Sequence, residues 1–110
     1  LMPATAFFEK GRRIAPASEG VFWLAGLWER WIGADGSELE SCCVLTTRPN
    51  ALVAPLHERM PVVVPPGLEQ PWLAQVDGPG LRALEPLLEP WDPAGWLAFR
   101  LDQAQLNLPL

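Results

Sequence analysis

Residues that bind metals are scarce in this sequence. Its 110 residues include one histidine, His57, and two cysteines, Cys42 and Cys43, which are adjacent. Neighbouring residues of a strand face opposite sides, so the two thiols cannot easily share a metal ion, and a disulfide between them would be strained. The apolar run around them predicts a strand whose thiols are buried and reduced, as in the cytoplasm. No metal site is therefore expected.

Several other signatures are also missing. No apolar run approaches the roughly 20 residues that span a bilayer, and no basic stretch leads into an apolar one as in a secretion signal. No Gly-x-x-x-x-Gly-Lys loop for a nucleotide and no Gly-x-Ser-x-Gly elbow for a nucleophilic serine is present. No cofactor is expected. The formal net charge of −5 gives no general attraction to nucleic acid. Any binding to phosphates therefore needs a local patch.

Turn-forming residues, in contrast, are abundant. Thirteen prolines and nine glycines predict short elements joined by many turns. The expected strands are residues 6–10, 21–32 with a bend at Gly26, 40–47, 62–64 and 96–102, the last with Leu97, Phe99 and Leu101 on its apolar face. The expected short helices are residues 51–56 after the N-cap Asn50, 71–74 and 79–84. The pattern predicts an α+β domain that is mainly β with short helices.

Two side chains are candidates for acid–base chemistry. His57 follows the expected helix at 51–56 and lies between Pro55 and Pro61, which stiffen the segment. An imidazole on a stiff loop suits general acid–base catalysis, although a lone histidine is by default a structural or surface residue. Glu9 follows two phenylalanines, and a carboxyl beside apolar rings can act as an acid near neutrality. The alternative for Glu9 is an ordinary strand residue facing solvent.

The arginines and tryptophans leave two alternatives each. The arginines either converge on a phosphate-binding face or lie apart as solvated residues. Of the six tryptophans, most are expected in the core, and one or two exposed ones could stack on bases or sugar rings. The arginines in question are Arg12, Arg13, Arg30, Arg48 and Arg59.

Four segments of the sequence resemble those of one known family, and they occur in the same order along the chain. Residues 51–63 read ALVAPLHERMPVV, residues 1–9 read LMPATAFFE, residues 25–29 read AGLWE and residues 45–47 read LTT. Together they resemble the SOS-response-associated peptidase (SRAP) family over roughly residues 1 to 75. Two positions depart from the family pattern, since Lys10 stands where an aromatic residue is usual and Ala6 where a glycine is usual.

The resemblance implies a fold, a function and a set of site residues. It implies an SRAP-like fold and the recognition of abasic sites in single-stranded DNA, which the family captures as a protective covalent crosslink. The family nucleophile is an N-terminal cysteine that self-removal of the initiator Met exposes; its amine condenses with the sugar aldehyde and its thiol closes a thiazolidine ring. By position, Glu9 and His57 match the active-site glutamate and histidine. Thr46 and Arg59 match contacts to the DNA backbone.

The missing nucleophile limits what this chain can do alone. Cys42 and Cys43 are internal and lack a free α-amine, so neither replaces the N-terminal cysteine. We therefore expect residues 1–110 to be the C-terminal portion of a single, incomplete SRAP-like domain, with its N-terminal half as a partner and no crosslinking by this chain alone. Peptidase and lyase-like activity are expected only of the complete domain. The alternatives are a non-catalytic single-stranded-DNA-binding or structural remnant and a tryptophan-rich carbohydrate- or protein-interaction domain.

Overall fold

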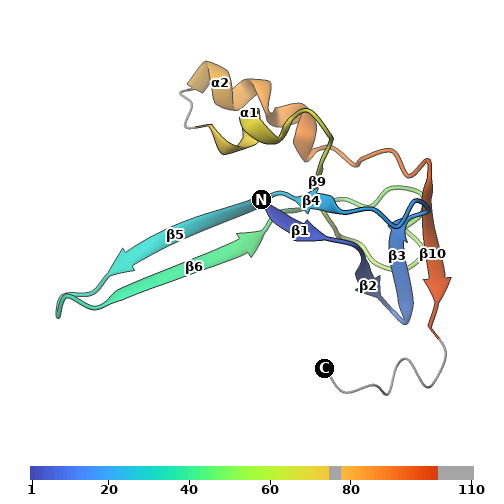
Figure 1. Cartoon of the computed structure of the whole chain (residues 1–110), viewed down its shortest axis with the longest axis horizontal. Helices are drawn as coiled ribbons and strands as arrows, with labels where there is room; N and C mark the ends of the chain where they lie inside the picture. The colour runs from blue at the N-terminus through green and yellow to red at the C-terminus, as the bar shows by residue number, and fades with distance from the viewer. Residues whose placement is uncertain (75–77, 102–110) are drawn as a thin grey trace.

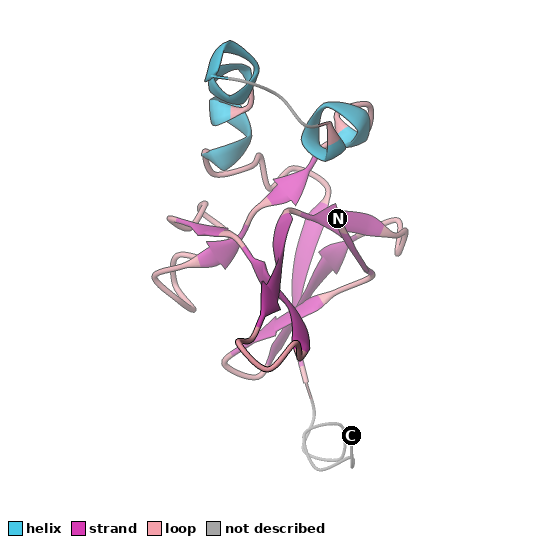
Figure 2. Ribbon diagram, turned by 90° about the vertical axis from the view of Figure 1, so that its left-hand side faces the viewer, coloured by secondary structure: helices cyan, strands magenta, loops and turns pink. Residues whose placement is uncertain are grey.

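The computed structural model describes residues 1–74 and 78–101. Its described part is mainly β, with short helices lying above the strands (Figures 1 and 2). Four small antiparallel sheets have the orders β1-β4-β9, β10-β3-β2, β5-β6 and β7-β8. The strands are β1 (Met2–Ala4), β2 (Phe7–Glu9), β3 (Arg12–Pro16), β4 (Phe22–Leu24), β5 (Gly26–Ile32), β6 (Glu38–Val44), β7 (Thr46–Thr47), β8 (Met60–Pro61), β9 (Val63–Val64) and β10 (Trp96–Arg100). The helices are α1 (Glu69–Leu73), α2 (Gly78–Ala83) and the 3-10 helix η1 (Glu85–Leu88).

This architecture confirms the expected α+β fold, mainly β with short helices. Both helices predicted after residue 70 are present, as α1 and α2. They are short because prolines and glycines interrupt the sequence around them. None of the described helices has the length and apolarity needed to cross a membrane.

One core cluster lies on the inner face of the β2–β3–β10 sheet. Ile14 of β3 is fully buried, with Phe7 of β2 and Ala98 of β10 opposite it in register. Val53 and Met60 complete the cluster from the opposite side. The 51–59 segment, which contains His57, is thereby held against this sheet by apolar contacts that water cannot replace.

A second cluster surrounds the junctions between consecutive strands. Ala25 joins β4 to β5, Leu45 joins β6 to β7, and Val62 joins β8 to β9. Their backbones form a closed ring of hydrogen bonds, each 2.9 Å long, from Ala25 N to Val62 O, from Val62 N to Leu45 O and from Leu45 N to Ala25 O. Ala25 and Val62 are fully buried. Three junctions between strands are therefore bonded to one another through the backbone, which fixes the β7–β8 pair relative to the other strands.

The β5–β6 hairpin extends away from both clusters (Figure 1). The expected Asp-Gly turn is present, and Asp35 Oδ1 accepts hydrogen bonds from Ser37 N at 2.9 Å and Ser37 Oγ at 2.6 Å. The prediction that Cys42 and Cys43 are buried was wrong, since both thiols are exposed. No described segment packs against this part of the hairpin, so the apolar residues around the two cysteines are not part of the hydrophobic core.

Several strand and helix predictions need correction. The expected strand 21–32 divides at Ala25 into β4 and β5, which belong to different sheets. The predicted arm 40–47 divides, because β6 ends at Val44 and β7 pairs instead with β8. Residues 51–56 form hydrogen-bonded turns rather than a helix. The face of β10 was assigned wrongly: Phe99 is 48% exposed, whereas Ala98 packs on the core. Alternation fixed which residues share a face of β10, but only packing against β3 decided which face is buried. Asp102, the last residue of the predicted strand, lies outside the described residues.

Candidate functional site

The turn that carries His57 is fixed at both ends. At its start, the Asn50 side-chain oxygen accepts hydrogen bonds from the backbone N–H groups of Leu52 and Val53, each at 3.1 Å. This is the N-cap geometry that the sequence predicted, although only turns follow it. At its end, His57 N donates to Val53 O at 3.0 Å, and Val53 is fully buried. The backbone of His57 is therefore anchored to the core while its side chain is exposed.

The His57 ring is oriented by the backbone of Arg59. Its Nδ1 lies 3.0 Å from both the N–H and the carbonyl oxygen of Arg59. When Nδ1 carries the proton it can donate to the carbonyl; when it does not, it can accept from the N–H. In either tautomer Nδ1 keeps a partner, and Nε2 has none among the described residues. Such a ring can serve as acid or base at Nε2 without turning.

The Arg59 side chain is held against Thr46. Its Nε donates to Thr46 Oγ1 at 3.2 Å and its Nη2 donates to the Thr46 carbonyl at 2.8 Å. Pairing of β7 with β8 explains the contact, because Thr47 lies opposite Met60 and Thr46 opposite Pro61. The two bonds leave further guanidinium N–H groups available to a ligand. The structure thus brings together three of the four residues that the resemblance singled out.

Glu9 is placed by strand β2 and not by the turn that carries His57. It follows Phe8 at the end of β2 and shares the inner face of that strand with Phe7, since alternate residues face the same side. Phe7 packs against the cluster that also receives Leu56, the neighbour of His57. Glu9 is half-buried, and its side chain has no hydrogen bond or ion pair within the described ranges. Both candidate acid–base residues therefore border one core cluster, while no direct contact joins them.

A row of charges across the sheet includes a residue that the sequence did not single out. Glu9 of β2 lies opposite Arg12 of β3, and Arg12 lies opposite Arg100 of β10. The row is one step beyond the buried row of Phe7, Ile14 and Ala98 on the same face. The alternation of β10 already placed Arg100 on the same face as Ala98. Because the opposite face was predicted to be buried, Arg100 was not recognised as a site residue.

Two of the other arginines that the sequence singled out, Arg30 and Arg48, are already paired with carboxylates. Arg30 lies on the extended hairpin and pairs with Glu38 at 2.6 Å, and Arg48 pairs with Glu89 at 2.5 Å. These pairs are exposed, so they add little stability, but each carboxylate competes with a phosphate for its guanidinium. The local phosphate-binding group is therefore Arg59 with Thr46, and Arg12 and Arg100 form a separate pair on the β2–β3–β10 sheet. Within residues 1–74 and 78–101, no group of three or more His, Cys, Asp or Glu side chains could hold a metal ion.

Comparison with known proteins identifies the family of this chain. A family model described as "SOS response associated peptidase (SRAP)" matches residues 1–104. The chain belongs to the SRAP family. SRAP relatives include the abasic site processing proteins YoqW of Bacillus subtilis and of Bacillus phage SPbeta, each 33% identical over 92% of this chain and 49% of its own length. The abasic site processing protein YoaM of Bacillus subtilis is 32% identical over 92% of this chain and 48% of its own length.

Two solved structures of longer chains are similar in fold to this one. A protein from Bacteroides thetaiotaomicron matches with a TM-score of 0.79 and 26% identity, covering 98% of this chain and 51% of that one. A protein from Bordetella bronchiseptica matches with a TM-score of 0.76 and 25% identity, covering 92% of this chain and 53% of that one. The chain thus spans about half the length of the relatives it matches.

Proposed function

We propose that residues 1–110 are the C-terminal portion of an SRAP domain that processes abasic sites in single-stranded DNA. The observation that carries the proposal is the arrangement at β7 and β8. There, His57 presents Nε2 to solvent from an anchored turn, beside an Arg59 guanidinium that Thr46 holds in place. Relatives of similar sequence over this chain are named abasic site processing proteins. A proton-transfer group next to a phosphate-binding group is what chemistry on a DNA sugar requires.

In this proposal Arg59 and Thr46 bind the DNA backbone. The remaining N–H groups of the Arg59 guanidinium donate to a phosphate, and the Thr46 hydroxyl adds a neutral donor. Arg12 and Arg100 supply positive charge on the adjacent sheet. Because the backbone of Arg59 also holds the His57 ring, the phosphate bound by the guanidinium lies near Nε2, while the orientation of the ring depends on the backbone and not on the guanidinium.

His57 and Glu9 then move the protons of covalent capture. The amine of an N-terminal cysteine outside this chain attacks the ring-opened sugar aldehyde and gives a carbinolamine. Loss of water, which needs a proton delivered to the departing hydroxyl, gives an imine. Addition of the cysteine thiol to the imine carbon, with its proton passing to nitrogen, closes a thiazolidine. We assign these transfers to His57 Nε2 and the half-buried Glu9 carboxylate, and self-removal of the initiator Met is what frees the amine.

The experiment uses the complete protein that contains this chain and single-stranded DNA with one abasic site. A denaturant-resistant adduct is expected on a gel. The substitution His57→Gln should slow its formation or reversal on the order of 100-fold, the lower range for a positioned acid–base group. Glu58→Gln is the matched control, since this exposed neighbour has no assigned role. Absence of an adduct with the unsubstituted protein would overturn the proposal.

The isolated chain gives a second readout. Residues 1–110 alone should form no adduct, because neither Cys42 nor Cys43 has a free α-amine. The alternative is a non-catalytic remnant of the same fold that binds single-stranded DNA. If the complete protein shows salt-sensitive binding to undamaged single-stranded DNA and no covalent product, the remnant is the better description. The cytoplasmic location expected from the sequence stays a prediction.

A further inference from the structure

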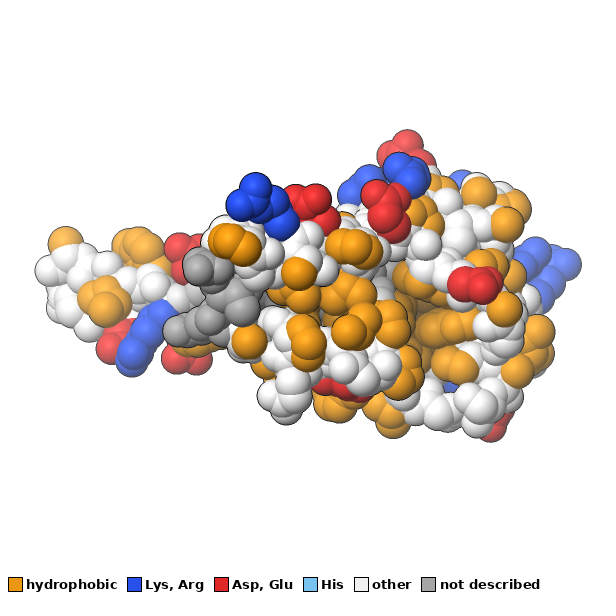
Figure 3. All heavy atoms as spheres, turned by 90° about the horizontal axis from the view of Figure 1, so that it is seen from above, with side chains coloured by type: hydrophobic (Ala, Val, Ile, Leu, Met, Phe, Trp, Pro, Cys, Tyr) orange, Lys and Arg blue, Asp and Glu red, His pale blue; other side chains and the backbone are white. Residues whose placement is uncertain are grey.

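A cavity with a volume of about 620 Å³ lies between β4, β9 and the segment that leads into β10. Four aromatic side chains line it, those of Phe22, Trp23, Trp91 and Trp96, together with three prolines. Seen from above, apolar side chains gather around a hollow on this part of the molecule, with a carboxylate beside it (Figure 3). The volume and the apolar lining are usual for a ligand-binding site. We call it the tryptophan cavity.

The tryptophans of this cavity differ in whether the indole N–H already has a partner. Trp91 donates to Pro61 O at 3.0 Å. Trp23 and Trp96 are half-buried, and neither indole N–H has a hydrogen-bond partner among the described residues. No fully buried side-chain nitrogen or oxygen atom of the described part lacks a partner, so these two N–H groups reach solvent. Two donors in the lining are therefore left for a ligand that carries carbonyl groups.

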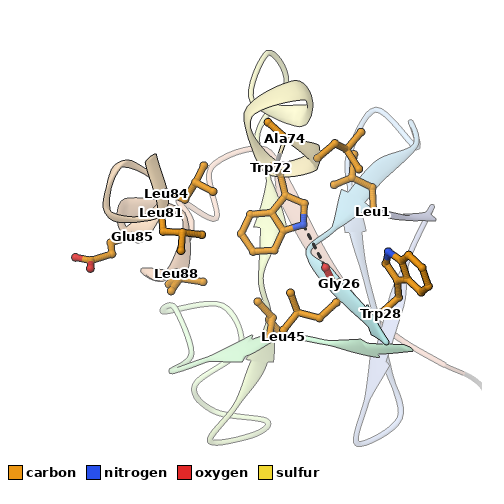
Figure 4. Close-up of a pocket in the computed structure, with 12 residues that line it drawn as sticks. Leu1, Gly26, Trp28, Leu45, Trp72, Ala74, Leu81, Leu84, Glu85 and Leu88 are labelled. Atoms are coloured by element: carbon orange, nitrogen blue, oxygen red, sulfur yellow. Dashed lines mark hydrogen bonds between the residues drawn. The ribbon is translucent and has the colours of Figure 1, made fainter. Parts of the chain in front are cut away.

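The groove beside the helices gives a useful contrast. There Trp72 lies next to Leu81 and Leu88 (Figure 4). The Trp72 indole N–H donates to Gly26 O at 3.3 Å, so this donor is satisfied within the protein. Glu85 is the only charged side chain among the described residues that line this groove. The tryptophan cavity, in comparison, combines two unpaired donors with two carboxylates.

The two carboxylates belong to Glu69 and Asp92, and no Lys, Arg or His is among the described residues that line the cavity. Glu69 Oε2 accepts a hydrogen bond from Gly67 N at 2.8 Å, and Asp92 Oδ1 accepts one from Ala94 N at 2.9 Å. Each carboxylate keeps a second oxygen, and neither has an ion pair within residues 1–74 and 78–101. Charge complementarity therefore favours a cationic group on the ligand, and indole rings attract such a group as well.

A proline-rich segment with a basic residue has the groups that these features match. In the polyproline II conformation the backbone makes no internal hydrogen bonds, so its carbonyl groups accept from outside. Such segments dock into aromatic-lined grooves, and because the helix is preformed, binding costs little conformational entropy. We propose that the tryptophan cavity binds a proline-rich segment of a partner protein that carries Arg or Lys beside a Pro-x-x-Pro core. The site shares no residue with the one assigned to DNA above, so the proposal does not rest on the DNA chemistry.

The experiment measures the fluorescence anisotropy of two labelled peptides with the complete protein that contains this chain. One peptide has Arg before a Pro-x-x-Pro core and the other has Arg after it, so that either orientation of the segment can bind. Saturable binding of at least one peptide is expected. Failure of both peptides to bind would overturn the proposal.

Charge removal on both partners tests the carboxylates. Asp92→Asn combined with Glu69→Gln keeps the acceptor oxygens for Ala94 and Gly67 and should weaken binding of the Arg peptide about tenfold, the lower end for hydrogen bonds to a charged group. A peptide with Gln in place of Arg should bind this variant and the unsubstituted protein equally. Glu85→Gln, in the groove beside the helices, is the matched control and should change nothing. Equal losses for the two peptides, or a loss with Glu85→Gln, would contradict the assignment.

The indole donors have a separate readout. In nitrogen-15 NMR spectra of the complete protein, the indole N–H signals of Trp23 and Trp96 should shift when the peptide binds, whereas the signal of Trp72 should stay. Trp23→Phe keeps a ring in the lining but removes one N–H, and it should weaken binding about fivefold. Trp31→Phe, at an exposed indole on the β5–β6 hairpin, is the matched control. Unshifted signals of Trp23 and Trp96, or equal effects of the two substitutions, would place the peptide elsewhere and overturn the proposal.

Discussion

Arg59 offers a sharp test of the proposed DNA contact, because its side chain and its backbone have separate roles. The guanidinium bonds to Thr46, while the backbone N–H and carbonyl hold His57 Nδ1. The substitution Arg59→Gln removes the charge and the two donors to Thr46 but keeps both backbone groups. We therefore expect weaker binding of single-stranded DNA with little change in the chemical step.

The size of the effect follows from losing one phosphate contact. A hydrogen bond to a charged group contributes about 1.5–3 kcal/mol, and the exposure of Arg59 favours the lower end. The dissociation constant should therefore rise about tenfold. For single strands, each neutralised phosphate changes the slope of log affinity against log salt by about 0.7. The slope for Arg59→Gln should be shallower by that amount, which corresponds to about a 2.6-fold smaller loss of affinity between about 50 and 200 mM salt.

Fluorescence anisotropy of labelled single-stranded DNA over a series of salt concentrations, with the complete protein, measures both quantities. Arg30→Gln is the matched control: it removes the same charge from the hairpin, where Glu38 already pairs with the guanidinium. Its slope should equal that of the unsubstituted protein. At saturating DNA, the rate of crosslinking by Arg59→Gln should stay within about twofold, since the backbone still orients His57. An unchanged slope, or a slope changed equally by Arg30→Gln, would refute the assignment of Arg59.

Two further predictions concern the turn that begins at Asn50 and the turn of the β5–β6 hairpin at Asp35. Asn50→Ala removes the acceptor for the N–H groups of Leu52 and Val53 and should lower the free energy of unfolding by about 0.5–2 kcal/mol in urea titrations. Asn50→Ser, whose hydroxyl can accept the same bonds without placing a charge against the Trp91 carbonyl, should cost less, and equal losses would count against the capping role. The hydrogen bonds from Ser37 hold the pKa of Asp35 below its ordinary value. The stabilisation that these hydrogen bonds give the folded state is therefore present at pH values above the pKa that Asp35 has in the unfolded chain. It is lost as the pH falls through the lowered pKa of Asp35 in the folded chain. In a carbon-13 NMR titration, Ser37→Ala should raise the pKa of Asp35, and an unchanged midpoint would disprove the cause.

Local sequence predicted the elements whose formation depends on neighbouring residues. The Asp-Gly turn of the hairpin, the Asn50 cap and the two helices after residue 70 all form as expected, because turn and cap residues act within a few positions. Prediction failed where long-range pairing decided the outcome. Thr46 continued an apolar run in the sequence, yet the ring of hydrogen bonds at Leu45 turns it away from β6 and towards β8. No local sequence pattern predicts hydrogen bonds among three junctions that lie far apart along the chain.

The candidate site shows the same division. The sequence singled out Glu9, His57 and Arg59 by residue type and setting, and then these three with Thr46 through the resemblance to the family. The structure brings His57, Arg59 and Thr46 together. Arg100 was missed because alternation cannot say which face of a strand is inside. The burial of Cys42 and Cys43 was predicted wrongly for a related reason. An apolar run favours burial, but the run itself does not show which segment of the protein packs against it.

By itself, the sequence determined the family, the short mainly β elements and the residue types at the site, since these depend on local propensity and on motifs read directly along the chain. The tertiary structure alone decided that the backbone of Arg59 orients the His57 ring, that Arg59 rests on Thr46, and that the β5–β6 hairpin stands open on both faces. Each of these depends on strands from distant parts of the chain meeting in one register. That meeting is set by packing over the whole fold, because the free energy of burial belongs to the assembled core and not to any one segment.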